Sequence, residues 1–290
     1  MSLISLLILA LVQGAAELLP VSSSAHVIVA ERLMGLDPSS PEMTFLLVML
    51  HTGTMFAVLF YFWPKWKASL SGQVPGAESA KIFLNRLIIA TVCTGVVGLG
   101  LKKIIEKLIL APLVGGDKAE IEQLFKNLPL IAAALLSVGI LILISASRDK
   151  SENKAALSTP KAVVIGIVQG LCLPFRGFSR SGATISTALL NGISRQQAEE
   201  FSFALAVLLT PPVVGLELLR LIKASGGISH LSSLGSLLMP GLLGMVLSFG
   251  SGFVALKILS AWLEQGKWKY FGIYCILASI GVYGAHLAGV

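Results

Sequence analysis

The sequence has little charge. Only 13% of its 290 residues are charged, about half the share of an average soluble domain. At the same time 55% of the residues are hydrophobic, and the mean hydropathy is +0.85. The low charge excludes a water-soluble globular protein, and the high hydrophobicity excludes an intrinsically disordered chain.

The sequence also lacks a cysteine pattern. Its three cysteines, Cys93, Cys172 and Cys275, each lie in apolar sequence with no second cysteine at the spacing of a metal or redox motif. We therefore expect them to be small packing residues. The first apolar run, Met1–Leu11, has no basic segment before it and no small-residue cleavage site after it, so we expect it to be retained.

Long apolar runs recur along the whole chain. A helix needs about 20 apolar residues to cross the hydrocarbon layer of a membrane, whereas the strands of a membrane barrel would alternate in polarity, which these runs do not. We predict an all-α polytopic membrane protein with six transmembrane helices, at about 43–64, 83–101, 128–147, 200–219, 237–259 and 270–289. The net charge of +7 comes mostly from Lys and Arg in short loops. This is a topology signal of membrane proteins, so it does not indicate binding of nucleic acid.

Two further segments resemble each other. Val12-Gln13-Gly14 and Val168-Gln169-Gly170 each follow a short apolar run, and each continues through a proline and a cluster of serines into small or apolar residues. Neither flanking run is long enough to cross a membrane. Broken backbone is tolerated at membrane depth only where it is buried or lines a cavity. We predict two re-entrant helix-loop-helix hairpins, at about 3–33 and 160–190.

The order of these elements predicts an inverted-topology repeat within a single membrane domain, 1–290. Three spans follow each hairpin. Since three is odd, repeat one (about 1–150) and repeat two (about 151–290) have opposite orientations in the membrane. The two serine-rich loops then enter from opposite faces and meet near the midplane. The face that bears both termini carries fewer Lys and Arg residues than the other, which places that face outside the cell.

Four chemically active residues fall in the broken segments: Glu17, His26, Arg176 and Arg180. A charged side chain at the centre of a membrane helix costs about 2.5–3.5 kcal/mol to insert, so we expect these residues to line one polar cavity. The alternative is that Glu17 merely pairs with Arg180 and holds the two repeats together. That pairing would explain the charges but not the hydroxyl groups and the histidine beside them.

These residue types indicate an anion site. The guanidinium of Arg180 is a planar set of donors suited to phosphate oxygens, and a helix that begins after it would direct free N–H groups toward an anion. Ser23 is a candidate nucleophile, with His26 as a candidate base nearby. Glu17 could orient the histidine, act as an acid or base, or bind a divalent cation. The further candidate substrate-binding residues are Gln13, one helical turn before Glu17, and Ser22, Ser24, Ser179, Ser181, Thr184 and Arg176. His51, early in a span, is as consistent with packing as with the site.

Paired motifs resemble one known family over nearly the whole chain. Gln13-x-x-x-Glu17 is similar to the (Glu/Gln)-x-x-x-Glu motif of the undecaprenyl pyrophosphate phosphatases of the bacitracin-resistance type, and Pro20-Val-Ser22-Ser23-Ser24-Ala-His26 is similar to the segment that follows it. Gly177-Phe-Ser179-Arg180-Ser181-Gly-Ala-Thr184 resembles the family's Pro-Gly-x-Ser-Arg-Ser-x-x-Thr motif. The sequence departs from the family at Arg176, which stands where the family has proline.

The resemblance implies hydrolysis of undecaprenyl pyrophosphate, a lipid substrate in the bacterial plasma membrane, to undecaprenyl phosphate and inorganic phosphate. It implies catalytic roles for Glu17, Ser23, His26 and Arg180. From side-chain chemistry we expect Arg180 to hold the pyrophosphate and Ser23 or His26 to attack or to activate water. Glu17 would orient His26 or bind Mg²⁺ or Ca²⁺. The nucleophile, the cation and the oligomeric state, a homodimer included, stay open at this point.

A flippase for polyprenyl phosphates or an anion transporter is the rival function. Inverted repeats with broken helices that meet at the midplane are typical of transporters, and an arginine-lined pocket can pass a phosphate headgroup. A carrier has no evident need for Glu17 and His26 beside Ser23. The catalytic residue types therefore favour the phosphatase. The distribution of Lys and Arg between the two faces predicts that its site opens toward the periplasm or the cell exterior.

Overall fold

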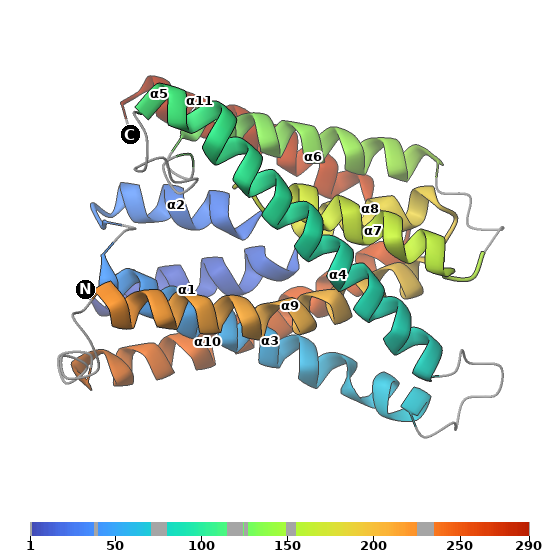
Figure 1. Ribbon diagram of the computed structural model, residues 1–290. Coiled ribbons are helices and arrows are strands. Elements are labelled where there is room, and N and C mark those ends of the chain that lie inside the picture. Colours follow the sequence, from blue (N-terminus) through green and yellow to red (C-terminus); the bar gives the residue numbers. More distant parts are fainter. Residues whose placement is uncertain are drawn as a thin grey trace.

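Six helices of the computed structural model are long and apolar enough to cross a membrane, as the sequence predicts. The structure describes residues 2–37, 40–70, 80–114, 124, 127–148, 155–224 and 235–289. The six helices are α3 (Pro41–Leu70), α4 (Ala80–Ile104), α6 (Leu128–Arg148), α9 (Arg195–Ala224), α10 (Gly235–Glu264) and α11 (Lys269–Leu287) (Figure 1). A π-helical stretch (Ile105–Leu110) and a short helix, α5 (Ala111–Val114), continue α4. The described part of the chain is otherwise helices and turns, with one isolated bridge between Ala155 and Ile193.

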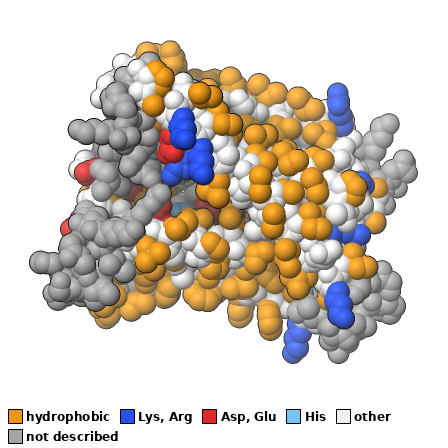
Figure 2. Space-filling model, viewed as in Figure 1, with side chains coloured by type: hydrophobic (Ala, Val, Ile, Leu, Met, Phe, Trp, Pro, Cys, Tyr) orange, Lys and Arg blue, Asp and Glu red, His pale blue; other side chains and the backbone are white. Residues whose placement is uncertain are grey.

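The surface of the bundle is that of a membrane protein. Large hydrophobic side chains that a soluble protein would bury are exposed on the spans, among them Phe60, Leu99, Leu277 and Ile280, each more than 60% exposed. Figure 2 shows hydrophobic side chains across the middle of one face, with most of the visible Lys and Arg side chains toward the ends of this band. An apolar band between charged ends matches a hydrocarbon layer between two aqueous phases.

Four shorter helices form two pairs at the positions of the predicted hairpins. The first pair is α1 (Leu3–Leu18) with α2 (Ser23–Leu33), and the second is α7 (Thr159–Cys172) with α8 (Arg180–Leu190). With 16 and 14 residues, α1 and α7 are about 24 and 21 Å long, too short for a hydrocarbon layer of about 30 Å. In Figure 1 the first pair lies toward the left end of the bundle, and α7 and α8 lie toward the right. The faces by which the pairs enter the membrane, and the inverted repeat, stay predictions.

The first helix of each pair packs tightly against a span of the other half of the chain. Helix α1 lies against α10, and α7 lies against α4. The contacts are close because glycine stands at them: a Cβ atom on Gly14 would overlap the side chain of Ser251, and one on Gly170 would lie 2.8 Å from the Cβ of Val97. Because each of these helices packs on a span of the other half, α1 and α7 are fixed within the bundle. Their positions determine where the α1–α2 loop and the α7–α8 loop lie.

Helix α8 is far more enclosed than α2. Nine of the eleven residues of α8 are buried, since it packs against α6, α7 and α9. Only four of the eleven residues of α2 are buried, and α2 packs mainly against α1. The predicted packing role of the cysteines agrees with the structure, in which all three are free thiols and Cys172 and Cys275 are buried.

Candidate active site

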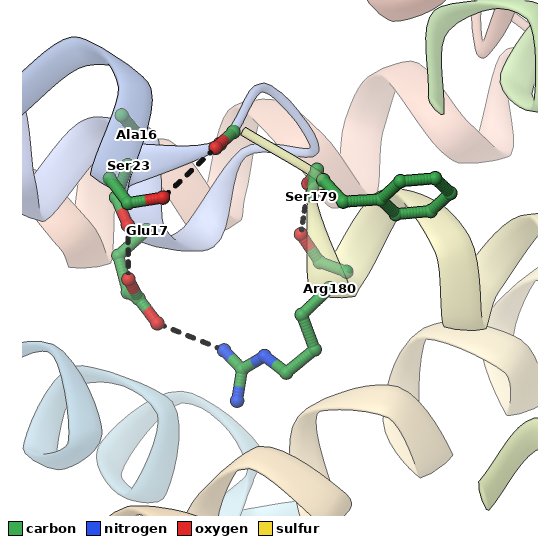
Figure 3. Close-up of a pocket in the computed structure, with 9 residues that line it drawn as sticks. Ala16, Glu17, Ser23, Ser179 and Arg180 are labelled. Carbon is green, nitrogen blue, oxygen red and sulfur yellow. Dashed lines mark hydrogen bonds and ion pairs between the residues drawn. The ribbon is translucent and has the colours of Figure 1, made fainter. Parts of the chain in front are cut away.

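The loops of the two hairpins meet around a small cavity, as the sequence predicts. The backbone N–H of Gly177 donates a hydrogen bond to Oγ of Ser24 (3.4 Å), and Oγ of Ser181 donates to the carbonyl oxygen of Leu19 (3.4 Å). The cavity has a volume of about 100 Å³ and is lined by Ala16, Glu17, Ser22, Ser23, Ser24, Phe178, Ser179, Arg180 and Ser181. Figure 3 shows Glu17 and Arg180 pointing toward each other across it.

Glu17, at the end of α1, is the centre of the polar contacts. Its Oε2 accepts hydrogen bonds from Oγ of Ser23 (2.5 Å) and Nε2 of Gln13 (3.2 Å). Its Oε1 accepts a bond from Nη2 of Arg180 (3.0 Å). The pair of Glu17 and Arg180 that the sequence allows is therefore present, and the side chains are 17% and 19% exposed. The carboxylate also holds the Ser23 hydroxyl, so the contact is more than a bridge between repeats.

Two helices begin at the cavity. Ser23 is the first residue of α2, and Arg180 is the first residue of α8. Ser179 caps α8, because its Oγ accepts a hydrogen bond from the backbone N–H of Gly182 (3.2 Å). The N-terminus of a helix carries a partial positive charge and unpaired N–H groups, so it favours an anion. Two such ends and a guanidinium converge on this cavity, which gives it the electrostatics of a phosphate site.

The serine-rich turn between α1 and α2 has an unusual backbone conformation. Ser22 has a φ of +69°, the only positive φ of a non-glycine residue among those described. Such a conformation costs about 1–3 kcal/mol and persists where the surroundings impose it, often at functional sites. It places the Ser22 and Ser24 hydroxyls 3.3 Å apart and turns Ser23 toward Glu17.

His26 does not contact Glu17. Its Nδ1 lies 2.8 Å from the carbonyl oxygen of Ser22, and its Nε2 lies 2.7 Å from the hydroxyl of Tyr274 in α11. Of the roles predicted for Glu17, orientation of His26 is therefore not what the structure shows. The partner of Glu17 that can serve as a nucleophile is Ser23.

His26 does not line the cavity, contrary to the expectation from the sequence, and three further predicted site residues also lie around the cavity without lining it. Gln13 is buried and binds Glu17. The hydroxyl of Thr184 is buried, donates to the carbonyl of Arg180 (2.9 Å) and lies 2.6 Å from Oγ of Ser202. Arg176 lies in the turn between α7 and α8, outside the lining of the cavity. These residues support the elements that carry the site.

His51 and Tyr274 are neighbours of the site. The sequence left His51 open between a packing role and a site role, and it did not indicate Tyr274. Nδ1 of His51 donates a hydrogen bond to the carbonyl oxygen of Leu47 (2.7 Å), and its Nε2 lies 3.7 Å from Oε2 of Glu17. The position of His51 early in an apolar span was the signal available for it. Tyr274 lies in the last span, and no local pattern connects it with a histidine 248 residues earlier.

The site offers one carboxylate for a metal ion. Among the described residues, no group of three or more His, Cys, Asp and Glu side chains lies close enough together to hold a metal. Mg²⁺ is commonly bound through one or two carboxylates, with substrate phosphates and water completing the shell. Glu17 fits that arrangement only with phosphate oxygens supplied by a ligand.

Comparisons with known proteins match nearly the whole chain. A profile of the family described as "Bacitracin resistance protein BacA" matches residues 6–281. An undecaprenyl-diphosphatase 2 of Acinetobacter baylyi is 56% identical over 282 residues, which is 96% of each chain. An undecaprenyl-diphosphatase of Desulfosudis oleivorans is 33% identical over 286 residues, 93% of each chain. An undecaprenyl-diphosphatase 2 of Burkholderia ambifaria is 33% identical over 98% of this chain and 97% of its own.

Proposed function

The chain belongs to the bacitracin resistance protein BacA family, and on this premise we propose that it is an undecaprenyl-diphosphatase. It hydrolyses undecaprenyl pyrophosphate to undecaprenyl phosphate and inorganic phosphate, and thereby recycles the lipid carrier of cell-wall synthesis. The observation that carries this function is the contact between Ser23, Glu17 and Arg180 at two converging helix N-termini. It joins a nucleophile, a base and a phosphate clamp in one cavity.

The cavity suits the headgroup rather than the whole lipid. Ligand pockets that enclose drug-sized molecules measure about 300–1,000 Å³, and this one measures about 100 Å³. Arg180 has five N–H donors, and its bond to Glu17 uses one nitrogen, Nη2. The remaining guanidinium and the first turns of α2 and α8 supply the donors for pyrophosphate oxygens, while the isoprenoid chain stays in the membrane.

Ser23 is the nucleophile and Glu17 its base in our proposal. The Ser23 hydroxyl already donates to Oε2 of Glu17. As Oγ of Ser23 attacks the terminal phosphorus, its proton passes to Glu17, and the bond between that phosphorus and the bridging oxygen breaks to release undecaprenyl phosphate. Glu17 gives up the proton to the solvent. Water then attacks the phosphoserine, and Glu17 takes a proton from it. The bond between phosphorus and Oγ of Ser23 breaks, and Glu17 passes the proton to the leaving Oγ, so that inorganic phosphate and free Ser23 result.

Arg180 stabilises the charge that develops on the phosphoryl oxygens during both steps. A divalent cation, Mg²⁺ or Ca²⁺, would be held by Glu17 together with pyrophosphate oxygens and water. When bound it would add positive charge beside the leaving group. The cation is a proposal from the chemistry of Glu17 and the substrate.

The active site faces the periplasm or the cell exterior in our proposal. The support is the smaller number of Lys and Arg residues on the face that bears both termini. Gly35, an exposed residue after α2, provides a test. A cysteine introduced there should react with an impermeant thiol reagent added outside the cell, and reaction from the cytoplasm alone would overturn the orientation.

Release of inorganic phosphate from undecaprenyl pyrophosphate by the detergent-purified protein tests the function directly, with Mg²⁺ and Ca²⁺ each supplied. The native protein should be active, Ser23→Ala should lose at least 100-fold in kcat, and Ser137→Ala, which removes an exposed hydroxyl in α6, should match the native protein. Substrate labelled with ³²P should leave an acid-stable phosphoserine on the native chain.

An acid-labile label on histidine would instead assign the nucleophile to His26. A folded native protein without phosphatase activity would favour the flippase or anion transporter. Transport of labelled undecaprenyl phosphate or of phosphate across proteoliposomes would then be the activity to measure.

A further inference from the structure

His26 is held at both ring nitrogens. One partner is the carbonyl oxygen of Ser22, four residues earlier, and the other is the hydroxyl of Tyr274 on α11. The two rings are stacked, with centroids 5.6 Å apart and planes 13° from parallel. The histidine therefore connects the last span of the protein to the serine-rich turn of the first hairpin.

The chemistry of the two partners fixes the tautomer of a neutral His26. A backbone carbonyl oxygen can only accept, so Nδ1 must carry the hydrogen and donate it to Ser22. In a neutral imidazole the other nitrogen then carries the lone pair. Nε2 must accept, and the Tyr274 hydroxyl must donate to it. The chain of donors runs in one direction, from Tyr274 through His26 to Ser22.

The far end of this chain is the strained part of the site. Ser22, with its φ of +69°, is the residue whose carbonyl His26 holds. The same turn carries Ser23 and Ser24, and all three serines line the cavity. A left-handed conformation at a non-glycine residue needs contacts that impose it, and the His26 ring supplies one through its Nδ1–H.

We propose that Tyr274 is a positioning residue for the phosphatase reaction, which acts through His26 on the Ser22–Ser24 turn. By donating to Nε2 it keeps the hydrogen on Nδ1, which holds the Ser22 carbonyl, and so keeps Ser23 directed at Glu17. This inference rests on the proposed function for its kinetic readout, but the tautomer it requires can be measured on the protein without substrate.

The competing explanation is that the contact serves only Tyr274. Its side chain is 45% exposed on a span, and a phenolic hydroxyl in apolar surroundings gains from any acceptor. In that case removal of the hydroxyl would change neither the histidine nor catalysis. The two explanations therefore differ in their effect on His26 and on kcat.

Nitrogen-15 NMR of the histidine side chains provides the first test. The chain has only four histidines, so selective labelling gives few signals, and the His26 signal is the one lost in His26→Asn. The native protein should show His26 in the tautomer with hydrogen on Nδ1, and Tyr274→Phe should lower the population of that tautomer. Hydrogen on Nε2 in the native protein, or an unchanged population in the variant, overturns the proposal.

Kinetics of undecaprenyl pyrophosphate hydrolysis provide the second test. Tyr274→Phe keeps the stacked ring and removes one hydrogen bond, so kcat should fall about three- to tenfold with KM unchanged. Tyr283→Phe, which removes a hydroxyl from the same helix, is the matched control and should retain native kcat. Asn at position 26 presents an amide N–H near the place of Nδ1, so His26→Asn should retain more activity than His26→Gln.

Tyr274→Phe should add nothing in the His26→Asn background, because the group through which Tyr274 acts is gone. An independent further loss there, or a Tyr274→Phe enzyme with native kcat, overturns the proposal. A native protein with no activity contradicts the proposed function instead, and the NMR result then decides the role of Tyr274 by itself.

Discussion

The first helices of the two hairpins, α1 and α7, carry the same three residues in different environments. Gln13 and Gln169 are each the middle residue of a Val-Gln-Gly sequence. The amide of Gln13 binds the carboxylate of Glu17 inside the site, whereas the amide of Gln169 donates to Oγ of Thr94 in α4 (3.3 Å). One glutamine serves the chemistry and the other serves helix packing.

The second helices of the two hairpins, α2 and α8, also differ in how tightly they pack against the spans. Helix α8 is enclosed by spans. Side-chain hydrogen bonds join it to α9, through Thr184 and Ser202, and to the turn before α11, through Nε1 of Trp268 and Ser186 (3.3 Å). Fewer residues of α2 are buried, and α2 contacts the spans at fewer points. Arg180 of the second hairpin therefore lies on a well-packed helix, α8. The nucleophile of the first hairpin lies on α2, which is less tightly packed and can adjust its position more easily.

The largest expected effect tests whether the second hairpin, through the guanidinium of Arg180, stabilises charge during the reaction. Arg180→Ala should lower kcat about 100- to 1,000-fold, since it removes the donor that stabilises the phosphoryl oxygens. Arg148→Ala removes an exposed arginine at the end of α6 and should leave kcat within twofold. Phosphate release is the measurement. A loss of kcat below tenfold in Arg180→Ala would mean that the second hairpin only supports the structure of the site and takes no direct part in catalysis.

A pair of glycines compares the packing of the two hairpins. Gly177 (φ +99°) lies in the second loop, where a Cβ would be 2.5 Å from the carbonyl oxygen of Ile131, and Gly35 (φ +66°) follows α2 with nothing within 4 Å. Both alanine variants incur left-handed strain of about 1–2 kcal/mol. Only Gly177→Ala adds overpacking, for about 3 kcal/mol or more in total. Thermal melting in detergent measures both, and equal losses would contradict a more tightly packed second hairpin.

His51 tests whether the first hairpin also depends on a span. His51→Leu removes the ring nitrogen 3.7 Å from Glu17, and we expect kcat to fall about fivefold, the effect of one polar contact near 1 kcal/mol. His51→Gln, which keeps an N–H donor of similar reach, should recover most of the activity. If both variants match the native enzyme, Glu17 is positioned by the hairpins alone.

The smallest expected effects distinguish a residue that only stabilises the fold, Thr184, from one that contacts the substrate, Ser24. Thr184→Val removes the buried hydroxyl that Ser202 contacts and should lower stability by about 1 kcal/mol without a change in KM. Ser24→Ala removes a hydroxyl that lines the cavity and accepts the N–H of Gly177, so it should raise KM severalfold and also lower stability by about 1 kcal/mol. The opposite pattern, a raised KM in Thr184→Val, would return Thr184 to the substrate-binding residues.

Much of the site was predictable because charged side chains cost free energy to bury within a membrane, so they are conspicuous in apolar sequence. Glu17 and Arg180 stand out in apolar sequence, and the serines beside them mark the broken helices. The partners of these residues were harder to predict. Ser23 and His26 lie three positions apart on one short helix, and only the strained backbone at Ser22 decides that Ser23 meets Glu17 while His26 faces α11.

The sequence by itself determined the six spans, the two short-helix pairs and the chemical types in the site, because apolar length and the cost of buried charge act on each segment separately. The pairing of Glu17 with Arg180 was already among the alternatives that the sequence offered, but the tertiary structure alone decided the other contacts: Glu17 with His51, His26 with Tyr274, and Thr184 with Ser202. These contacts join different helices, and the packing of one helix on another is set by close surface fit that no local pattern contains.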